Sequence, residues 1–156
     1  MISVKGKWAL ITGASRGIGY LTALFMAKQG CNLVLHSRSL ENTKKLMGEV
    51  KAFGVDVYCV EAELANHQEV VRMLDDIEAN GTEIDIVFNN AAVQLTYRND
   101  YFKTPVEDLD LSLRVNFVAV TTICYRLIPK MIDRGFGRVI NATSGIRDQP
   151  EQAGYS

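Results

Sequence analysis

The chain has 156 residues, 47% of them hydrophobic, which is the size of one domain with a sizeable core. Its 17 Lys and Arg residues nearly balance its 18 Asp and Glu residues, giving a net charge of -1, which argues against a nucleic-acid partner or an acidic disordered tail. The apolar runs are too short for a membrane span and the N-terminus has no secretory signal pattern, so we expect a cytoplasmic protein with no membrane partner.

Strand and helix patterns alternate along the chain. Buried strands are predicted at residues 8–12, 32–36, 55–60, 84–88 and 138–142. Helical spacing of apolar residues follows each of the first four strands, with Gly30 ending the first helix, Asn66 capping the third and the fourth running from about residue 109 to 134. Strands this apolar are covered on both faces, which predicts a doubly wound parallel α/β sheet in the order 3-2-1-4-5. We expect residues 1–156 to form a single domain.

A glycine-rich segment follows the first strand. Gly13, Gly17 and Gly19 lie between the strand and the first helix, so the backbone can turn tightly there and approach a ligand closely. Backbone N–H groups and the positive end of the helix dipole then surround one small space, which suits a phosphate. The Gly-x3-Gly-x-Gly spacing fits neither the G-x-G-x-x-G fingerprint nor the G-x4-G-K-[ST] loop, and an ordinary turn is the alternative reading of this segment alone.

Polar residues also follow each of the other four predicted strands. They are Ser37 and Arg38, Glu63, Asn89 and Asn90, and Thr143 and Ser144. In a parallel doubly wound sheet these positions share one edge, and the ligand crevice lies where the winding reverses, beyond strands 1 and 4. Together they favour a ligand site over a set of ordinary loops.

These motifs, in this order, resemble those of the short-chain dehydrogenase/reductases, particularly the 3-oxoacyl-acyl-carrier-protein reductase-like members. Residues 12–19 match the T-G-x-x-x-G-x-G loop of that family, and residues 89–92 are similar to its N-N-A-G element. Asn116 stands where the family has an active-site Asn, Ser144 where it has the catalytic Ser, and Tyr155 where it has the Tyr of Y-x-x-x-K. The resemblance covers the whole chain and implies a Rossmann-like domain that binds NAD(P).

The choice of cofactor is argued from charge. A carboxylate after the second strand would accept hydrogen bonds from a ribose 2′-OH and repel a 2′-phosphate. Ser37 and Arg38 occupy that place, no acid follows before Glu41, and Arg16 of the glycine loop can reach the same region. Two guanidinium groups suit a phosphate monoester, which predicts NADP(H), with two solvated surface arginines as the alternative.

The resemblance adds further expected cofactor contacts. The Glu63-Leu64 pair is similar to the family's Asp-hydrophobic pair at the adenine, with a longer acid, and a plain surface Glu is the alternative. Asn90 is expected at the cofactor ribose, and Ala92 replaces a Gly, which would strain the loop if that position had positive φ. The expected cofactor-binding residues are Gly13, Ser15, Arg16, Gly17, Ile18, Gly19, Ser37, Arg38, Glu63, Leu64, Asn90 and Ala91.

For catalysis the resemblance implies reduction of a carbonyl, or oxidation of an alcohol in reverse. Ser144 would hold the carbonyl of a small or acyl-thioester substrate, and Tyr155 would give its proton as hydride arrives from the nicotinamide. A free phenol titrates near pH ~10, and in the family a Lys four residues after the Tyr lowers that pKa. That position would be 159, beyond this sequence. Asn116 resembles the residue that helps a water chain reach this Lys.

The three cysteines and two histidines are assigned no chemistry. Cys31, Cys59 and Cys124 lie in apolar segments without C-x-x-C spacing, which favours buried thiols over metal ligands or disulfides. His36 ends a predicted strand and His67 begins a predicted helix, and neither has a partner at ligand spacing, so we expect no metal.

Two other functions stay open at this stage. One is a nucleotide-binding sensor or scaffold without turnover on the same fold, and the other is an isomerase or dehydratase of the same superfamily. The resemblance also implies a C-terminal helix, further strands and a substrate loop beyond residue 156, without which we expect the fragment to be inactive. It further implies a homodimer or homotetramer that packs through the helix at 109–134.

Overall fold

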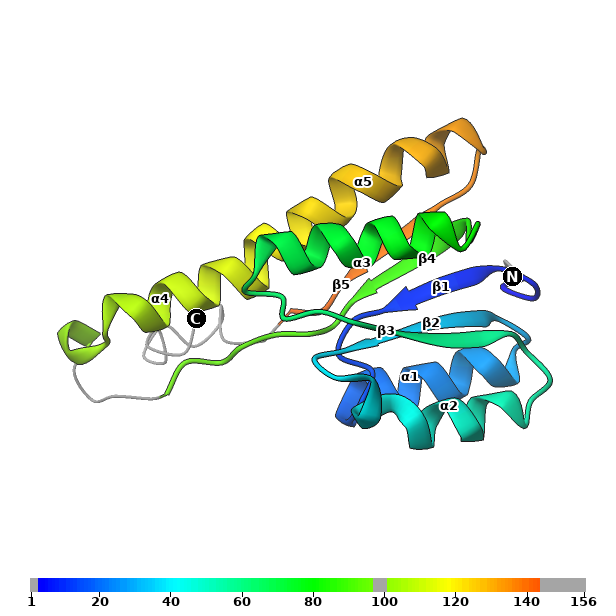
Figure 1. Cartoon of the computed structure of the whole chain (residues 1–156), viewed down its shortest axis with the longest axis horizontal. Coiled ribbons are helices and arrows are strands. Elements are labelled where there is room, and N and C mark those ends of the chain that lie inside the picture. Colours follow the sequence, from blue (N-terminus) through cyan, green and yellow to red (C-terminus); the bar gives the residue numbers. More distant parts are fainter. Residues whose placement is uncertain (1–2, 97–100, 144–156) are drawn as a thin grey trace.

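The structure, a computed structural model, describes residues 3–96 and 101–143. Five strands form one sheet in which all neighbours are parallel, in the order β3-β2-β1-β4-β5 (Figure 1). They are β1 (Trp8–Ile11), β2 (Asn32–Ser37), β3 (Val57–Glu61), β4 (Ile84–Asn89) and β5 (Arg138–Asn141). The predicted doubly wound architecture and strand order are therefore confirmed, with every strand end within two residues of its predicted position.

The helices lie in two layers, one on each face of the sheet. Figure 1 shows α1 (Gly17–Lys28) and α2 (Lys44–Lys51) on one face, and α3 (His67–Ala79) and α5 (Val120–Asp133) on the other. The α5 segment is the last part of a continuous 28-residue helix that begins with α4 (Val106–Leu113) and passes through a π-helical segment, η3 (Arg114–Ala119). Two short 3₁₀ turns, η1 (Leu40–Thr43) and η2 (Tyr101–Lys103), complete the elements.

The core consists of two apolar layers separated by the sheet. In β1, Leu10 belongs to the layer under α3 and α5, whereas Ala9 and Ile11 belong to the layer under α1 and α2, and all three are fully buried. This alternation is the two-residue period of a strand covered on both sides. Strand β1 therefore packs against both helical layers. The loop that follows it begins from a strand buried on both faces.

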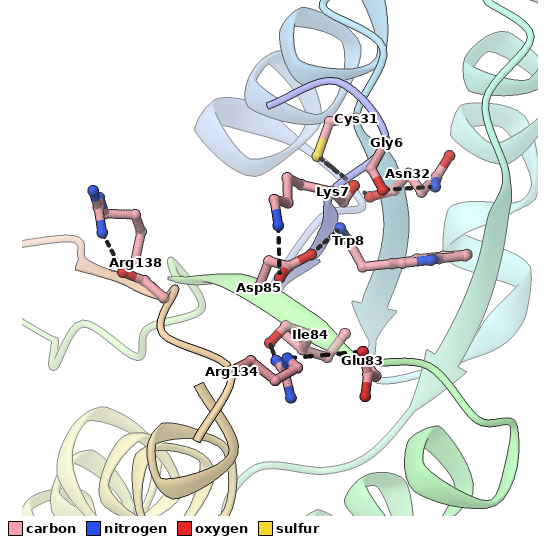
Figure 2. Close-up of polar contacts among 11 residues, drawn as sticks. Gly6, Lys7, Trp8, Cys31, Asn32, Glu83, Ile84, Asp85, Arg134 and Arg138 are labelled. Carbon is pink, nitrogen blue, oxygen red and sulfur yellow. Dashed lines mark hydrogen bonds and ion pairs between the residues drawn. The ribbon is translucent and has the colours of Figure 1, made fainter. Parts of the chain in front are cut away.

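Asp85 links β1 and β4 where the two strands begin, at their amino-terminal ends. Its Oδ2 accepts a hydrogen bond from the Trp8 N–H at 3.1 Å, and its Oδ1 lies 3.4 Å from Lys7 Nζ (Figure 2). The β1–β4 pairing shifts by one residue between Trp8 and Ala9, so Asp85 supplies an acceptor where the ladder is interrupted. Beyond this bulge the pairing is regular up to Ile11 and Phe88, which brings the carboxyl ends of β1 and β4 level.

The helix Val106–Asp133 corrects one expectation about apolar runs. With 28 residues and a mean hydropathy of 1.3 over its most apolar window, it is long and apolar enough to cross a membrane by length and composition alone. However, Ile123, Leu127 and Met131 on one side of it pack into the core against the sheet. At its end, Arg134 donates to the Ile84 carbonyl at 2.7 Å, which fastens the helix to β4 (Figure 2).

Candidate functional site

The glycine loop between β1 and α1 uses its three glycines in different ways. Gly13 and Gly17 have φ of 65° and 60°, a left-handed conformation that costs other residues energy. Gly19 has ordinary φ but no room, because a Cβ there would lie 2.5 Å from the Gly13 oxygen and 2.6 Å from Asn90 Nδ2. The loop is therefore a shaped turn in which no other residue type fits these positions without strain.

The N-terminus of α1 is open to an anion. The helix begins at Gly17, its first turn has no acidic residue, and Arg16 at the N-cap makes no capping hydrogen bond with its side chain. The first N–H groups of a helix have no intrahelical acceptor, and they combine with the positive end of the helix dipole. Ile18 in this turn is 67% exposed, so the N-terminus faces the outside of the protein.

Thr12 joins the glycine loop to the end of β4. Its Oγ1 accepts hydrogen bonds from Asn90 N at 2.9 Å and Ala91 N at 3.0 Å, and lies 3.4 Å from the Phe88 carbonyl, to which it donates. Thr12 is 2% exposed. One buried hydroxyl thus fixes both sides of the crevice at the point where the winding of the sheet reverses.

The two neighbouring asparagines have different roles. Asn90 Nδ2 donates to the Thr12 carbonyl at 2.9 Å and to the Gly13 carbonyl at 3.2 Å, so this amide braces the glycine turn. Asn89 Nδ2 donates to Asn141 Oδ1 at 2.9 Å, which ties β4 to β5. Of the Asn90 side chain, only Oδ1 has no partner among the described residues, so it is the atom left to meet a ligand.

His36 is a buried polar connection that sequence reasoning left without a role. Its side chain is enclosed, with the residue 1% exposed, and Nδ1 accepts the Gly13 N–H at 3.3 Å while Nε2 lies 3.1 Å from the Ala62 carbonyl. A carbonyl can only accept, so Nε2 carries the proton and Nδ1 is free to accept. Burial lowers the pKa of the imidazole, opposed by the Ala62 hydrogen bond and the charge of Glu63. No motif in the sequence indicated this connection.

A cleft of about 800 Å³ opens above these residues, within the usual size range of a small-molecule site. Eleven of the twelve expected cofactor-binding residues line it, and Gly19, which packs beneath the loop, does not. The lining residues that the sequence did not single out as contacts are His36, Asn42, Ala92, Val93, Gln94 and Val115. The structure thus brings together residues from the ends of β1, β2, β3 and β4.

The charge of the cleft favours an anion. Arg16 and Arg38 are exposed, and neither side chain has a hydrogen bond or ion pair with another residue in the described ranges. Glu63 is the one carboxylate among the lining residues. The Ser37 hydroxyl donates to the Ser39 carbonyl at 2.6 Å, so in this conformation its proton is not available to a ligand. The two guanidinium groups are therefore cationic donors that remain free to bind an anion in the cleft.

Glu63 is partly committed to the loop after β3. Its Oε1 accepts the Ala65 N–H at 3.3 Å, and its own N–H donates to Glu69 Oε2 at 2.7 Å. The predicted N-cap of α3 is confirmed, because Asn66 Oδ1 accepts from two N–H groups of the first turn. The Glu69 carboxylate accepts hydrogen bonds from Glu63 N and Asn66 Nδ2, which ties this cap to the loop after β3. Leu64, the other half of the pair, is 6% exposed and belongs to the core.

Asn116 lies in the π-helical segment and faces the loop after β4. Its Nδ2 donates to the Val93 carbonyl at 2.8 Å and to Ser112 Oγ at 3.1 Å, and its Oδ1 accepts the Val93 N–H at 2.9 Å. The side chain therefore pairs with one residue of the loop like a short stretch of sheet. Its side chain holds the rim of the cleft in place.

The remaining expectations concern Ala92, the catalytic pair and metals. Non-glycine residues with positive φ are absent from the described part of the chain, so Ala92 carries no such strain. Ser144 and Tyr155 lie outside the described residues, which end at Thr143. Cys31 is buried and Cys59 and Cys124 are half-buried, all with free thiols. Within residues 3–96 and 101–143 there is no group of three or more metal-ligating side chains.

Known proteins resemble this chain in both sequence and fold. The family model described as short chain dehydrogenase matches residues 7–156. The 3-oxoacyl-[acyl-carrier-protein] reductase of Staphylococcus epidermidis is 32% identical over 152 residues, which are 96% of this chain and 62% of the relative. Rat 17-beta-hydroxysteroid dehydrogenase 13 is 32% identical over 142 residues, or 91% of this chain and 47% of the relative. The chain thus spans less than two thirds of the length of these curated relatives.

Two solved structures show the same fold. A 3-oxoacyl reductase of Agrobacterium tumefaciens with NADP bound is 27% identical with a TM-score of 0.88, over 96% of this chain and 57% of that one. An NAD+-bound xylitol dehydrogenase is 26% identical with a TM-score of 0.88, over 99% of this chain and 60% of that one. Because similar folds hold either dinucleotide, the choice between them depends on the residues of this chain.

Proposed function

The chain belongs to the short-chain dehydrogenase family, and on that premise we propose that the complete protein is an NADP(H)-dependent oxidoreductase acting on a carbonyl or a secondary alcohol. The observation that carries the choice of cofactor is the pair Arg16 and Arg38, two exposed guanidinium groups without partners among the described residues, in the cleft beside the glycine loop. When bound, the cofactor supplies or accepts the hydride. The residues of the chain bind and orient the reactants.

The cleft fits a dinucleotide with a 2′-phosphate. The open N–H groups at Gly17 and Ile18 suit the diphosphate, and Arg16 and Arg38 suit the 2′-phosphate, which a guanidinium can hold bidentately. Glu63, through its remaining carboxylate oxygen, would meet the adenine side of the cleft. The NADP-bound Agrobacterium reductase, which shares the fold, supports this assignment.

For the chemical step we assign Ser144 to hold the substrate carbonyl and Tyr155 to protonate it as hydride arrives. A phenol with a pKa near ~10 is about three units from neutrality, so a nearby cation is needed to bring it into the working range. Asn116 would keep the rim loop and the long helix together while this happens, since its side chain is hydrogen-bonded to Val93 of the loop and to Ser112 of the helix.

Family membership also leads us to propose the extent of the domain, the substrate class, the cellular location and the assembly of the protein. Residues 1–156 would be the dinucleotide-binding part of a single domain, completed by the length that the relatives have in addition. The substrate would be a small carbonyl compound or an acyl thioester, as the names of the reductase relatives suggest. We place the enzyme in the cytoplasm as a homodimer or homotetramer, with the helix Val106–Asp133 at the subunit contact because Phe117 and Tyr125 on it are 64% and 81% exposed.

Cofactor selectivity tests the proposal. We expect Arg38→Asp to weaken NADPH binding about 10- to 100-fold, since a hydrogen bond to a charged group contributes ~1.5–3 kcal/mol, and to leave NADH binding nearly unchanged. Arg72→Asp is the matched control, because Arg72 is exposed on α3 and outside the cleft lining. Dissociation constants from isothermal titration decide the matter. Equal losses for NADPH and NADH would exclude the 2′-phosphate contact.

Turnover needs a separate test in the complete protein. NADPH oxidation is followed against a panel of ketones and 3-oxoacyl thioesters, with Tyr155→Phe as the variant. The variant is expected to lose most turnover and to keep its affinity for NADPH. Absence of NADPH oxidation by the wild type with every carbonyl tested would instead favour a nucleotide-binding protein without turnover.

A further inference from the structure

We propose that His36 is a positioning residue of the cofactor site, whose imidazole holds the Gly13 N–H and thereby keeps the glycine loop in the shape that receives the dinucleotide. The proposal rests on the function proposed above. It assigns a role to a buried polar side chain that none of the motifs includes.

Three segments meet at this imidazole. His36 lies near the end of β2, Gly13 lies in the loop after β1, and Ala62 follows β3. The main chain of His36 contributes as well, since its carbonyl accepts the Ala14 N–H at 2.9 Å. Two successive N–H groups of the loop, those of Gly13 and Ala14, are therefore both fixed by one residue of β2.

The contact with Gly13 matters because of the conformation of this residue. Gly13 has a φ of 65°, and its Cα has little free space because a Cβ there would lie 3.0 Å from the Ala91 Cα. Its N–H donates to the imidazole and is therefore not available to a ligand, so the later N–H groups of the loop are the ones left to bind it. Without an acceptor at Nδ1 this N–H would be unpaired and part-buried, which favours a shift of the loop.

The ring must be neutral to fill this role. Protonated at both nitrogens, the imidazole could donate to Ala62 but would turn an N–H toward the N–H of Gly13. Burial lowers the pKa of His36, while the charge of Glu63 acts in the opposite direction. The other charged groups that line the same cleft are Arg16 and Arg38. The arrangement therefore weakens only at acid pH, below the ordinary histidine value of 6.5.

A matched pair of substitutions separates the two hydrogen bonds. In His36→Asn the Oδ1 atom is bonded to Cγ, as Nδ1 of histidine is, so it can still accept the Gly13 N–H, but the hydrogen bond to Ala62 is lost. In His36→Gln the Nε2 amide lies one bond further out and can still donate to the Ala62 carbonyl, but the carbon Cδ stands in place of the acceptor for Gly13. Each variant loses one hydrogen bond, so the melting temperatures are expected to fall by similar amounts.

NADPH affinity, measured by titration of the complete protein at pH 7.5, distinguishes them. We expect His36→Asn to bind within about twofold of the wild type and His36→Gln to bind about tenfold more weakly. Equal affinities of the two variants, whether both are reduced or both are unchanged, would overturn the proposal. A wild type that does not bind NADPH would instead overturn the proposed function, so the two failures are distinguishable.

A second measurement on the wild type needs no substitution. If NADPH requires the neutral imidazole, linkage demands that the bound cofactor lower the pKa of His36 further. Nitrogen NMR of the imidazole, titrated with and without NADPH, reports this shift site by site and excludes interference from the cofactor's own phosphate. A pKa that NADPH leaves unchanged or raises would contradict a positioning role, even if both variants failed to fold.

Discussion

Replacing Thr12 by Val tests how far one hydroxyl holds the two sides of the cleft together. Val keeps the shape and size of the side chain, but it removes the acceptor of the Asn90 and Ala91 N–H groups, which lie 2.9 and 3.0 Å from Oγ1. An unsatisfied N–H costs about 1–3 kcal/mol, and because both groups are only part-buried we take about 1 kcal/mol for each. The free energy of unfolding should therefore fall by about 2 kcal/mol, or about 4–8 °C in melting temperature for a protein of this size class.

Urea unfolding followed by circular dichroism measures this loss, and Thr12→Ser is its matched control. Ser keeps the oxygen and loses only a buried methyl group, which contributes about 1 kcal/mol. NADPH affinity should fall in the Val variant and persist in the Ser variant, because the hydroxyl joins the glycine loop to Asn90. A Thr12→Val variant that is as stable as the wild type, or that loses less free energy of unfolding than Thr12→Ser, would refute the role of the Thr12 hydroxyl in joining the glycine loop to the end of β4.

Three further outcomes follow from local geometry. Gly19→Ala should reduce NADPH affinity at least tenfold, because the new Cβ would lie 2.5 Å from the Gly13 carbonyl oxygen. Gly48→Ala in α2 is the control, because no atom lies within 4 Å of a Cβ there, and it should leave binding unchanged in the same titration. Burial raises the pKa of Cys31 to about 12, so at pH 8 only about 10⁻⁴ of this thiol is ionised and it should resist a thiol reagent until the protein unfolds. Hydrogen bonding by Arg126 lowers the pKa of Glu78 below 4.5 in the folded protein. The stabilisation that Glu78 provides is therefore full above pH 4.5 and is lost as the pH falls through the pKa of the folded state. Arg126→Gln should make the free energy of unfolding depend less on pH in this acid range.

The sequence predicted the sheet and the place of the cleft because both depend on local pattern. Alternating apolar runs and helical spacing specify a doubly wound sheet, and the carboxyl ends of parallel strands must share an edge. The glycine loop and Arg38 therefore came together as expected. The largest difference in the fold is the helix Val106–Asp133, which starts three residues before its predicted position and contains a π-helical segment that no periodicity indicates.

The polar connections beneath the cleft could not be predicted in the same way. His36 reads as one more residue of a strand, and its partners at Gly13 and Ala62 are 23 and 26 residues away. The Ser37 hydroxyl looked available for a ligand, but it bonds to a carbonyl two residues later. Asn116 was expected through its family role, yet its pairing with both polar groups of Val93 depends on how the long helix meets the loop. Such contacts depend on tertiary distances that the sequence pattern does not contain.

The most direct test of the NADP(H) assignment is a crystal structure of the complete protein with NADPH bound. We expect the diphosphate at the N-terminus of α1, against the N–H groups of Gly17 and Ile18. We expect the 2′-phosphate within hydrogen-bonding distance of the Arg16 and Arg38 guanidinium groups. A dinucleotide bound elsewhere, or a 2′-phosphate in solvent away from both arginines, would contradict it.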